Sequence, residues 1–288
     1  MEQGKVFFPA RLVPYLAHEE VRSLPPERLR ELTIRHLYQF LLSTTHLETR
    51  IVNRAAELIA TGQSGLDLCE RVRLDAFKVY CDEGYHALYS LDLAEQVSAA
   101  TGIPVPPCDY GALVSRIMEL GHRLLPGEPR LAALLQVVVF ETLITAVINE
   151  VPADPSVVGT VREMMRDHAR DEGRHHRFFG AFLHELWAQL DTSLRTPAAL
   201  AMPALMTGCL SWDVEPVRGS LRLAGLDEQA IERVVRDCYL DPQADDRKRQ
   251  ICHATVRLCA SAGLLAVPGA EEEFAVHGLL EDGTWHAS

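Results

Sequence analysis

The sequence contains two copies of one short motif, Asp-Glu-Gly-x-His. They are Asp82-Glu83-Gly84-Tyr85-His86 and Asp171-Glu172-Gly173-Arg174-His175. A single Glu-x-x-His is expected by chance in a chain of this composition, whereas two copies that share the flanking Asp and Gly are not. Residues three apart on a helix share one face, so the Glu and the His of each copy can bind the same metal ion. The motif therefore predicts a helical fold in which two such pairs face each other.

Apolar periodicity and helix-breaking residues divide the chain into helices. We predict long helices over about 27–60, from the break at 61–65 to about 100, over 131–151 and over 156–189. A proline-rich connection over 101–129 holds a shorter helix at about 110–124. Short, long and short connections are typical of a four-helix bundle with one crossover. The predicted fold class is therefore all-α, a ferritin-like bundle with additional C-terminal helices.

The bulk composition predicts one soluble domain. Hydrophobic residues make up 48% and charged residues 24% of the chain, as in ordinary globular proteins. No polar linker divides residues 1–288, so we expect a single domain with an N-terminal arm (1–26), a metal-binding core (27–190) and a C-terminal extension (191–288). The central run 137–140 is apolar on all sides, which predicts that the third long helix is buried all round.

The net charge and the lack of recognisable targeting signals restrict the binding partners and the location that we expect. A formal net charge of −12 argues against a nucleic acid or an anionic membrane as partner. No signal peptide and no apolar stretch of about 20 residues is visible. The seven cysteines form no CxxC pair and are read as scattered thiols of a reducing compartment. We therefore expect a cytoplasmic protein.

Two further glutamates complete a metal site on the other two long helices. Glu48 lies on the same helical stripe as Leu41 and Ile51, and Glu141 lies between Phe140 and Ile144 in the most apolar helix. A helical glutamate is ordinarily a surface residue, but these surroundings leave no polar face to turn outward. The order Glu, Glu-x-x-His, Glu, Glu-x-x-His is the carboxylate-bridged arrangement of di-iron and di-manganese proteins.

His168 adds an imidazole to the second motif. It precedes Glu172 by four residues and His175 by seven, so all three share one face, whereas the equivalent position in the first motif is Val79. The alternative reading is an ordinary core or surface histidine. With His168, the predicted metal ligands are Glu48, Glu83, His86, Glu141, His168, Glu172 and His175, and no catalytic residue is predicted beyond them.

The aspartate of each motif has two possible roles. A metal-binding histidine usually donates its other N–H to a carboxylate, which fixes its tautomer. Asp82 and Asp171 could each reach the histidine of the opposite helix in this way. Alternatively, they are surface aspartates paired with Arg174 or Arg170.

The ligand order Glu48, Glu83-x-x-His86, Glu141, His168-x-x-x-Glu172-x-x-His175 resembles the di-iron N-oxygenases typified by p-aminobenzoate N-oxygenase. The resemblance covers about residues 7–190. It implies two iron ions, dioxygen as co-substrate, a homodimer, and oxidation of an amine nitrogen of a small molecule to the hydroxylamine, nitroso or nitro level in specialised metabolism. Manganese is the metal that we expect in the site if the protein is loaded with a metal other than iron.

The resemblance also implies an arrangement of ligands. Glu83 and Glu172 would bridge the two irons, and Glu48 and His86 would complete one of them. Glu141, His168 and His175 would complete the other. Electrons would come from a ferredoxin or reductase, because the sequence has neither a dinucleotide-binding fingerprint nor the cysteine spacing of an iron–sulfur cluster.

Two other functions remain open at this point. Another di-iron oxidation, such as hydroxylation or desaturation of carbon, fits the same ligands, because the pocket and not the ligands selects the substrate. A ferritin-like iron-handling protein is the second alternative, although a C-terminal extension of this size would obstruct packing into a cage.

Overall fold

The computed structural model describes residues 4–107, 109–143, 148–211, 213–240 and 244–280, and these residues are predominantly helical. One bridge between Val6 and Val157 is the only β-type pairing among them. The all-α prediction is therefore confirmed. The main helices are α1 (Glu19–Arg22), α2 (Pro26–Leu47), α3 (Asn53–Ala60), α4 (Glu70–Thr101), α5 (Gly111–Leu124), α6 (Pro129–Leu143), α8 (Gly159–Gln189), α9 (Thr192–Cys209), α10 (Glu215–Ala224), α11 (Glu228–Val235), α12 (Ala244–Ala262) and α13 (Ala270–Val276).

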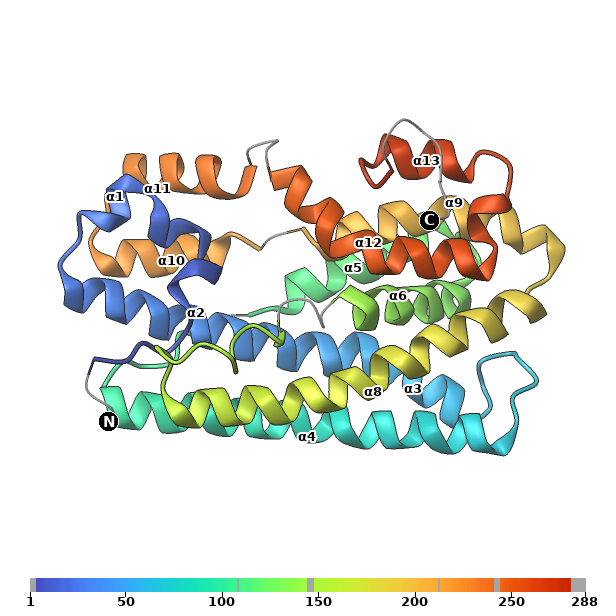
Figure 1. Cartoon of the computed structure of the whole chain (residues 1–288), viewed down its shortest axis with the longest axis horizontal. Helices are drawn as coiled ribbons and strands as arrows, with labels where there is room; N and C mark the ends of the chain where they lie inside the picture. Colours follow the sequence, from blue (N-terminus) through green and yellow to red (C-terminus); the bar gives the residue numbers. More distant parts are fainter. Residues whose placement is uncertain (1–3, 108, 144–147, 212, 241–243, 281–288) are drawn as a thin grey trace.

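Four long helical segments form the bundle. The first consists of α2, a π-helical turn η3 (Glu48–Val52) and α3, which follow one another without a break. The others are α4, α6 and α8. Helices α4 and α8 contact each other, and they lie side by side in the lower part of Figure 1. Helix α4 also contacts the first segment, and α8 also contacts α6. The long connection between α4 and α6 contains α5, so the molecule has the single crossover of a ferritin-like bundle.

Turn residues at the ends of α4 explain where this helix begins and ends. The preceding turn contains Gly62 and Gly65, with φ of 75° and 82°, and α4 ends at Gly102 with φ of 71°. Such left-handed backbone angles are routine only for glycine. The predicted third helix runs to about residue 151, whereas residues 149–150 form a turn; residues 144–147, which also fall within the predicted helix, lie outside the described part.

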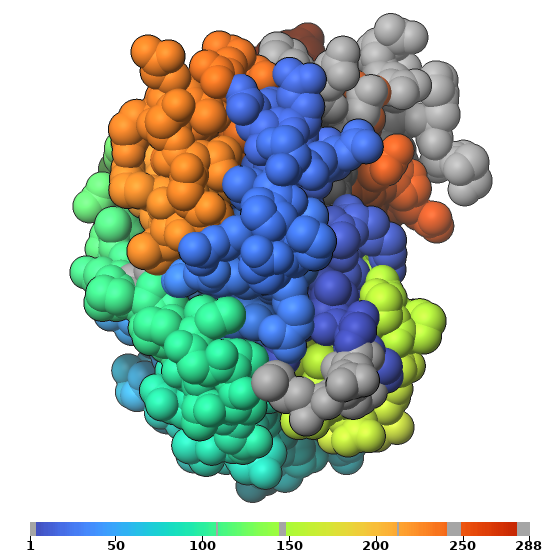
Figure 2. All heavy atoms as spheres, turned by 90° about the vertical axis from the view of Figure 1, so that its left-hand side faces the viewer, coloured from blue at the N-terminus to red at the C-terminus, as the bar shows by residue number. Residues whose placement is uncertain are grey.

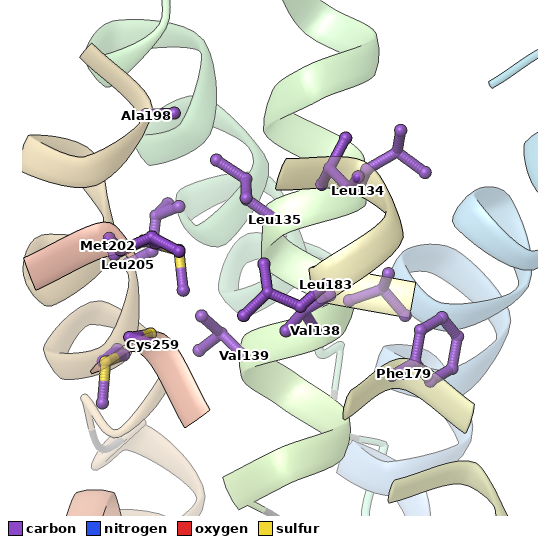
Figure 3. Close-up of a cluster of buried hydrophobic side chains, with 14 of the residues drawn as sticks. Leu134, Leu135, Val138, Val139, Phe179, Leu183, Ala198, Met202, Leu205 and Cys259 are labelled. Carbon is purple, nitrogen blue, oxygen red and sulfur yellow. The ribbon is translucent and has the colours of Figure 1, made fainter. Parts of the chain in front are cut away.

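The third long helix lies at the centre of the main hydrophobic core. All residues from Leu131 to Leu143 are buried, so the predicted burial on every side is confirmed. Figure 3 shows α6 side chains between those of α8 and α9, with Cys259 of α12 beside them. The labelled residues of this core are Leu134, Leu135, Val138 and Val139 of α6, Phe179 and Leu183 of α8, and Ala198, Met202 and Leu205 of α9.

The C-terminal helices cover the bundle. Helices α9 and α12 contact α6, and α10 contacts α2. Figure 2 shows the end of the molecule where the N-terminal helices lie beside α10 and α11, and buried side chains from both regions form a second core there. This covering removes α6 from solvent and leaves α4 as an outer helix of the bundle.

Candidate metal centre

The seven predicted ligands converge inside the bundle. Each of the four long segments contributes at least one of them, and every side chain is almost completely buried, with at most 1% exposed. They are Glu48 on η3, Glu83 and His86 on α4, Glu141 on α6, and His168, Glu172 and His175 on α8.

The seven side chains form two groups that share one member. The first group is Glu48, His86, His168 and Glu172, and the second is Glu83, Glu141, Glu172 and His175. Within each group, one ligand atom from every residue lies within 4.8 Å of the others. Each group therefore offers four donors at a spacing that can hold one metal ion, and Glu172 belongs to both.

Glu83 also faces both groups. Its Oε1 lies 2.8 Å from His175 Nδ1, and its Oε2 lies 3.3 Å from His86 Nδ1. Since the two histidines belong to different groups, the carboxylate spans the space between them. This is the position that a bridging carboxylate requires.

His168 lies in a different group from the one that the family resemblance implies. Its Nε2 is 2.9 Å from Glu48 Oε1 and 3.2 Å from Glu172 Oε1, so it joins Glu48 and not Glu141. The reason is helix geometry. His168 precedes Glu172 by about one turn and His175 follows it by about one turn, so the two histidines flank Glu172 about 10 Å apart along the axis. In this structure His168 is therefore grouped with Glu48, whereas the resemblance implies a shared iron with Glu141.

A π-helical turn begins at Glu48. Such turns insert one residue into an α-helix and are frequent at functional sites. The turn changes the angular position of Glu48 relative to Ile51 and Val52, which are also buried. No spacing rule in the sequence indicates this turn, so the orientation of Glu48 comes from the tertiary structure.

The aspartates of the two motifs contact the histidines of the opposite helix. Asp171 Oδ2 lies 3.2 Å from His86 Nε2, and Asp82 Oδ2 lies 3.2 Å from His175 Nε2. Arg174 lies 2.6 Å from Asp171 and 3.4 Å from Asp82, so the ion pairs considered as the alternative role are also present. In both histidines Nε2 faces an aspartate while Nδ1 faces the glutamates.

The imidazole ring of His168 has the opposite orientation to those of His86 and His175. Its Nε2 faces Glu48 and Glu172, and its Nδ1 is buried without a hydrogen-bond partner in the described part of the chain. The three histidines thus present one ring nitrogen each to the carboxylates. This arrangement supplies neutral nitrogen donors together with carboxylate oxygens, a set that suits iron or manganese.

Several buried carboxylate oxygens have no hydrogen-bond partner among the described residues. Both oxygens of Glu48 and both of Glu141 are of this kind, although Glu48 Oε1 lies close to His168. Burying a carboxylate without a partner is costly, and a bound cation removes that cost. The donor chemistry and the unpartnered oxygens therefore fit two metal ions.

The same crowding shifts the pKa values of the glutamates. Burial raises the pKa of Glu48 to about 7, and the nearby His168 only partly opposes this effect. Burial and repulsion from Glu172 and Glu83 raise the pKa of Glu141 well above its usual range. For Glu172, hydrogen bonds from His168 and His175 outweigh burial and lower the pKa.

The pKa values of two histidines are raised as well. Burial alone would lower the pKa of His168, but Glu48 and Glu172 outweigh it and raise the pKa to about 10. For His175, Glu172 and Glu83 likewise outweigh burial and raise the pKa to about 12. Without a metal, these histidines are therefore protonated and partly neutralise the carboxylates.

Tyr89 is a neighbour that the sequence analysis did not identify. Its ring centroid lies 5.4 Å from that of His86 and 5.8 Å from that of His168. Its hydroxyl is buried without a hydrogen-bond partner among the described residues, and burial next to Glu48 raises its pKa. The signal was available in the sequence, because Tyr89 follows His86 by three residues and shares its helix face.

A groove of about 660 Å³ between α4 and α8 approaches the site from outside. Val72, Val79 and Phe182 contribute apolar surface, and Asp82 and His175 lie among its lining residues. Because His175 turns Nε2 toward Asp82, the groove reaches the outer side of the imidazole, away from Nδ1. The lining residues are Arg71, Val72, Asp75, Lys78, Val79, Asp82, Arg174, His175, Arg177, Phe178, Ala181, Phe182 and Glu185.

A ferritin-like bundle with two buried Glu/His groups defines the class of non-haem di-iron carboxylate proteins. The family model described as P-aminobenzoate N-oxygenase AurF matches residues 1–263. The chain therefore belongs to this family of di-iron N-oxygenases, and it is an oxidoreductase with two iron ions as cofactor. A comparison with curated proteins gives no match. No helix in the described part of the chain is long and apolar enough to cross a membrane.

Proposed function

We propose that this chain oxidises the amine nitrogen of a small molecule with dioxygen, to the hydroxylamine, nitroso or nitro level, as a cytoplasmic enzyme of specialised metabolism. The observation that carries the proposal is the extra imidazole of His168 within the Glu48 group, in a chain of the N-oxygenase family. This histidine goes beyond the symmetric Glu, Glu-x-x-His pattern of generic ferritin-like sites.

The geometry supports a specific set of ligands. Glu48, His86 and His168 would hold one iron, Glu141 and His175 would hold the other, and Glu83 and Glu172 would bridge them. The support is the sharing of Glu172 between the two groups and the two-sided contact of Glu83. When bound, the iron ions supply the reduction of dioxygen and the transfer of oxygen to nitrogen.

The protein's own residues prepare this chemistry. Asp171 and Asp82 accept the Nε2–H of His86 and His175, which leaves the lone pair of each Nδ1 directed toward the glutamates. Complete burial of the ligands excludes water from the centre. Tyr89 adds a phenol whose hydroxyl is not engaged with any described group and which lies beside His86 and His168.

Two electrons per turnover have to come from outside the chain. We propose a ferredoxin or a reductase as donor, because the sequence contains no second redox cofactor motif. The outer sides of His86 and His175 contact Asp171 and Asp82, whose side chains are 25% and 32% exposed. These aspartates therefore give a short hydrogen-bonded path from solvent to the ligands, beside which a donor could bind.

Product analysis with labelled dioxygen tests the proposed function. The protein is expressed in iron-replete cells, its iron content is measured, and the reduced form is mixed with ¹⁸O₂ and a panel of arylamines, aliphatic amines and amino acids. Two irons per chain and ¹⁸O on the nitrogen of one amine class support N-oxygenation. Oxygen on carbon, or a desaturated product, would instead support the other di-iron oxidations. Repeated iron uptake without any organic product would support iron handling.

A further inference from the structure

Tyr89 connects the metal centre with an exposed tyrosine on the same helix. Its ring centroid lies 5.4 Å from that of His86 and 5.8 Å from that of His168, and the rings of these two histidines are 4.0 Å apart. On its other side, the ring of Tyr89 lies 5.5 Å from that of Tyr85 in an edge-to-face arrangement. The four rings therefore form a continuous path that begins at two predicted metal ligands.

The path leads from the interior of the bundle to solvent. Tyr89 follows His86 by three residues and Tyr85 by four, so it is a neighbour of both on the surface of α4. His86 is completely buried, Tyr89 is half-buried with a buried hydroxyl, and Tyr85 is 65% exposed. Since α4 is an outer helix of the bundle, each step along the path brings the ring closer to the surface (Figure 1).

The second motif lacks both tyrosines. Phe178 and Arg174 occupy the positions of α8 that correspond to Tyr89 and Tyr85 of α4. A phenol can lose an electron together with its O–H proton, whereas phenylalanine has no such proton to release. The path is therefore specific to the group that contains His86 and His168.

The burial of the metal centre gives such a path a use. A metal pair that has reacted with dioxygen is a strong oxidant, and because its predicted ligands are at most 1% exposed, a reductant in solution cannot touch it. Met165 is completely buried and precedes His168 by three residues, so it shares the face of this ligand. Methionine is readily oxidised to the sulfoxide, which disrupts a core. An oxidised centre that finds no amine would therefore damage its own surroundings.

The surroundings of the Tyr89 hydroxyl allow its proton to leave. The hydroxyl has no hydrogen-bond partner among the described residues, so no contact holds the proton in place. The negative charges of Glu48 and Asp171 act on this hydroxyl. Asp171 is 25% exposed, so its carboxylate can pass a proton between the buried phenol and solvent.

We propose that Tyr89 and Tyr85 form an electron relay that reduces the oxidised metal centre when no amine is bound. Tyr89 gives one electron to the centre and its hydroxyl proton to Asp171, which leaves a neutral tyrosyl radical. Tyr85 then gives one electron to the Tyr89 radical and its own proton to water, while Asp171 returns the proton to Tyr89. A soluble reductant, such as ascorbate, restores Tyr85 by donating a hydrogen atom. Each passage removes one oxidising equivalent from the centre.

Rapid freeze-quench electron paramagnetic resonance of the full-length, iron-loaded protein tests the relay. The reduced protein is mixed with dioxygen without an amine, and ring-deuterated tyrosine identifies the radical by its altered hyperfine splitting. We expect a tyrosyl radical that ascorbate quenches in the original chain, loss of the radical in Tyr89→Phe, and a radical that ascorbate no longer quenches in Tyr85→Phe. The matched control is Tyr80→Phe on the same helix, whose ring lies beside Phe77 and outside the path, and which should leave the radical and its quenching unchanged.

Mass spectrometry gives a second readout. After repeated reduction and oxygenation without an amine, sulfoxide at Met165 should accumulate faster in Tyr89→Phe than in the original chain, and ascorbate should protect only the original chain. Circular dichroism and iron content confirm that each variant is folded and loaded.

Two outcomes would overturn the relay. One is a tyrosyl radical that persists in Tyr89→Phe, and the other is an original chain whose irons are oxidised by dioxygen without any radical. The relay rests on the proposed reaction with dioxygen but not on the oxidation of an amine. Mössbauer spectra of the same samples separate the two, because irons that stay reduced in the presence of dioxygen would overturn the proposed function together with the relay.

Discussion

Asp171 of α8 lies 3.2 Å from Nε2 of His86 on α4, and the reciprocal pair, Asp82 and His175, has the same distance. Each Asp-Glu-Gly-x-His motif therefore orients the histidine of the other motif. Because the aspartates are partly exposed and the histidines are buried, the aspartates can be changed without removing a predicted ligand.

Asp171→Asn should weaken metal binding by about 10- to 100-fold, because a neutral amide accepts the Nε2–H of His86 more weakly than a carboxylate does, and its NH2 group can instead donate to Nε2 and favour the other tautomer. Titration of the metal-free protein with Mn²⁺ or Fe²⁺ measures the effect. The matched control is Asp167→Asn, which changes an aspartate one turn earlier on α8 that pairs with Arg170 at the surface. Unchanged affinity in the Asp171 variant would contradict the orienting role.

His168→Gln should affect one of the two metal positions more than the other. His168 contacts Glu48, whereas the group of Glu83, Glu141, Glu172 and His175 does not include it. We expect one metal per chain at nearly the original affinity, a second bound at least about tenfold more weakly, and loss of N-oxygenation. Metal analysis and product assays measure this, with the exposed His184 replaced by glutamine as control. Two tightly bound metals with full activity would refute the assignment.

Glu141→Gln should stabilise the metal-free protein and abolish its stabilisation by metal. Burial and repulsion from Glu172 and Glu83 make the charged carboxylate unfavourable, and an amide of similar shape removes the charge. We expect the free energy of unfolding without metal to rise by about 1 kcal/mol. Thermal unfolding with and without Mn²⁺ tests both effects, because a ligand that binds only the folded state raises its stability. A less stable metal-free variant would contradict the prediction.

Metal binding should release protons and strengthen as pH rises. Neighbouring carboxylates outweigh burial and raise the pKa of His168 to about 10 and that of His175 to about 12 in the metal-free protein. Both histidines are then protonated near neutral pH, and each must lose its proton to bind a metal. Calorimetry in buffers of different ionisation enthalpy should detect release of at least about two protons per chain, because Glu48 and Glu141, whose pKa values are also raised, lose protons on binding too. A metal affinity that falls as the pH is raised from about 6.5 to about 8 would contradict the predicted release of protons.

Much of the fold was predictable because its determinants are local. The two Asp-Glu-Gly-x-His motifs required helices, the proline-rich connection after residue 101 indicated the crossover, and the apolar run in α6 indicated a helix buried on all sides. These features follow from the 3.6-residue period and from the cost of burying polar groups. They are visible in a one-dimensional sequence because the interacting positions are only a few residues apart.

The tertiary structure alone decided which groups meet across helices. His168 joined Glu48 because it lies on the opposite side of Glu172 from His175, and the π-helical turn changed the direction of Glu48. The sequence allowed Asp171 either a surface ion pair or a contact with His86, and the packing of α4 against α8 produced both. Long-range pairings of this kind depend on the rotation and relative height of whole helices, which no short sequence window contains. The sequence therefore determined which residues can act, and the packing of the bundle determined which of them act together.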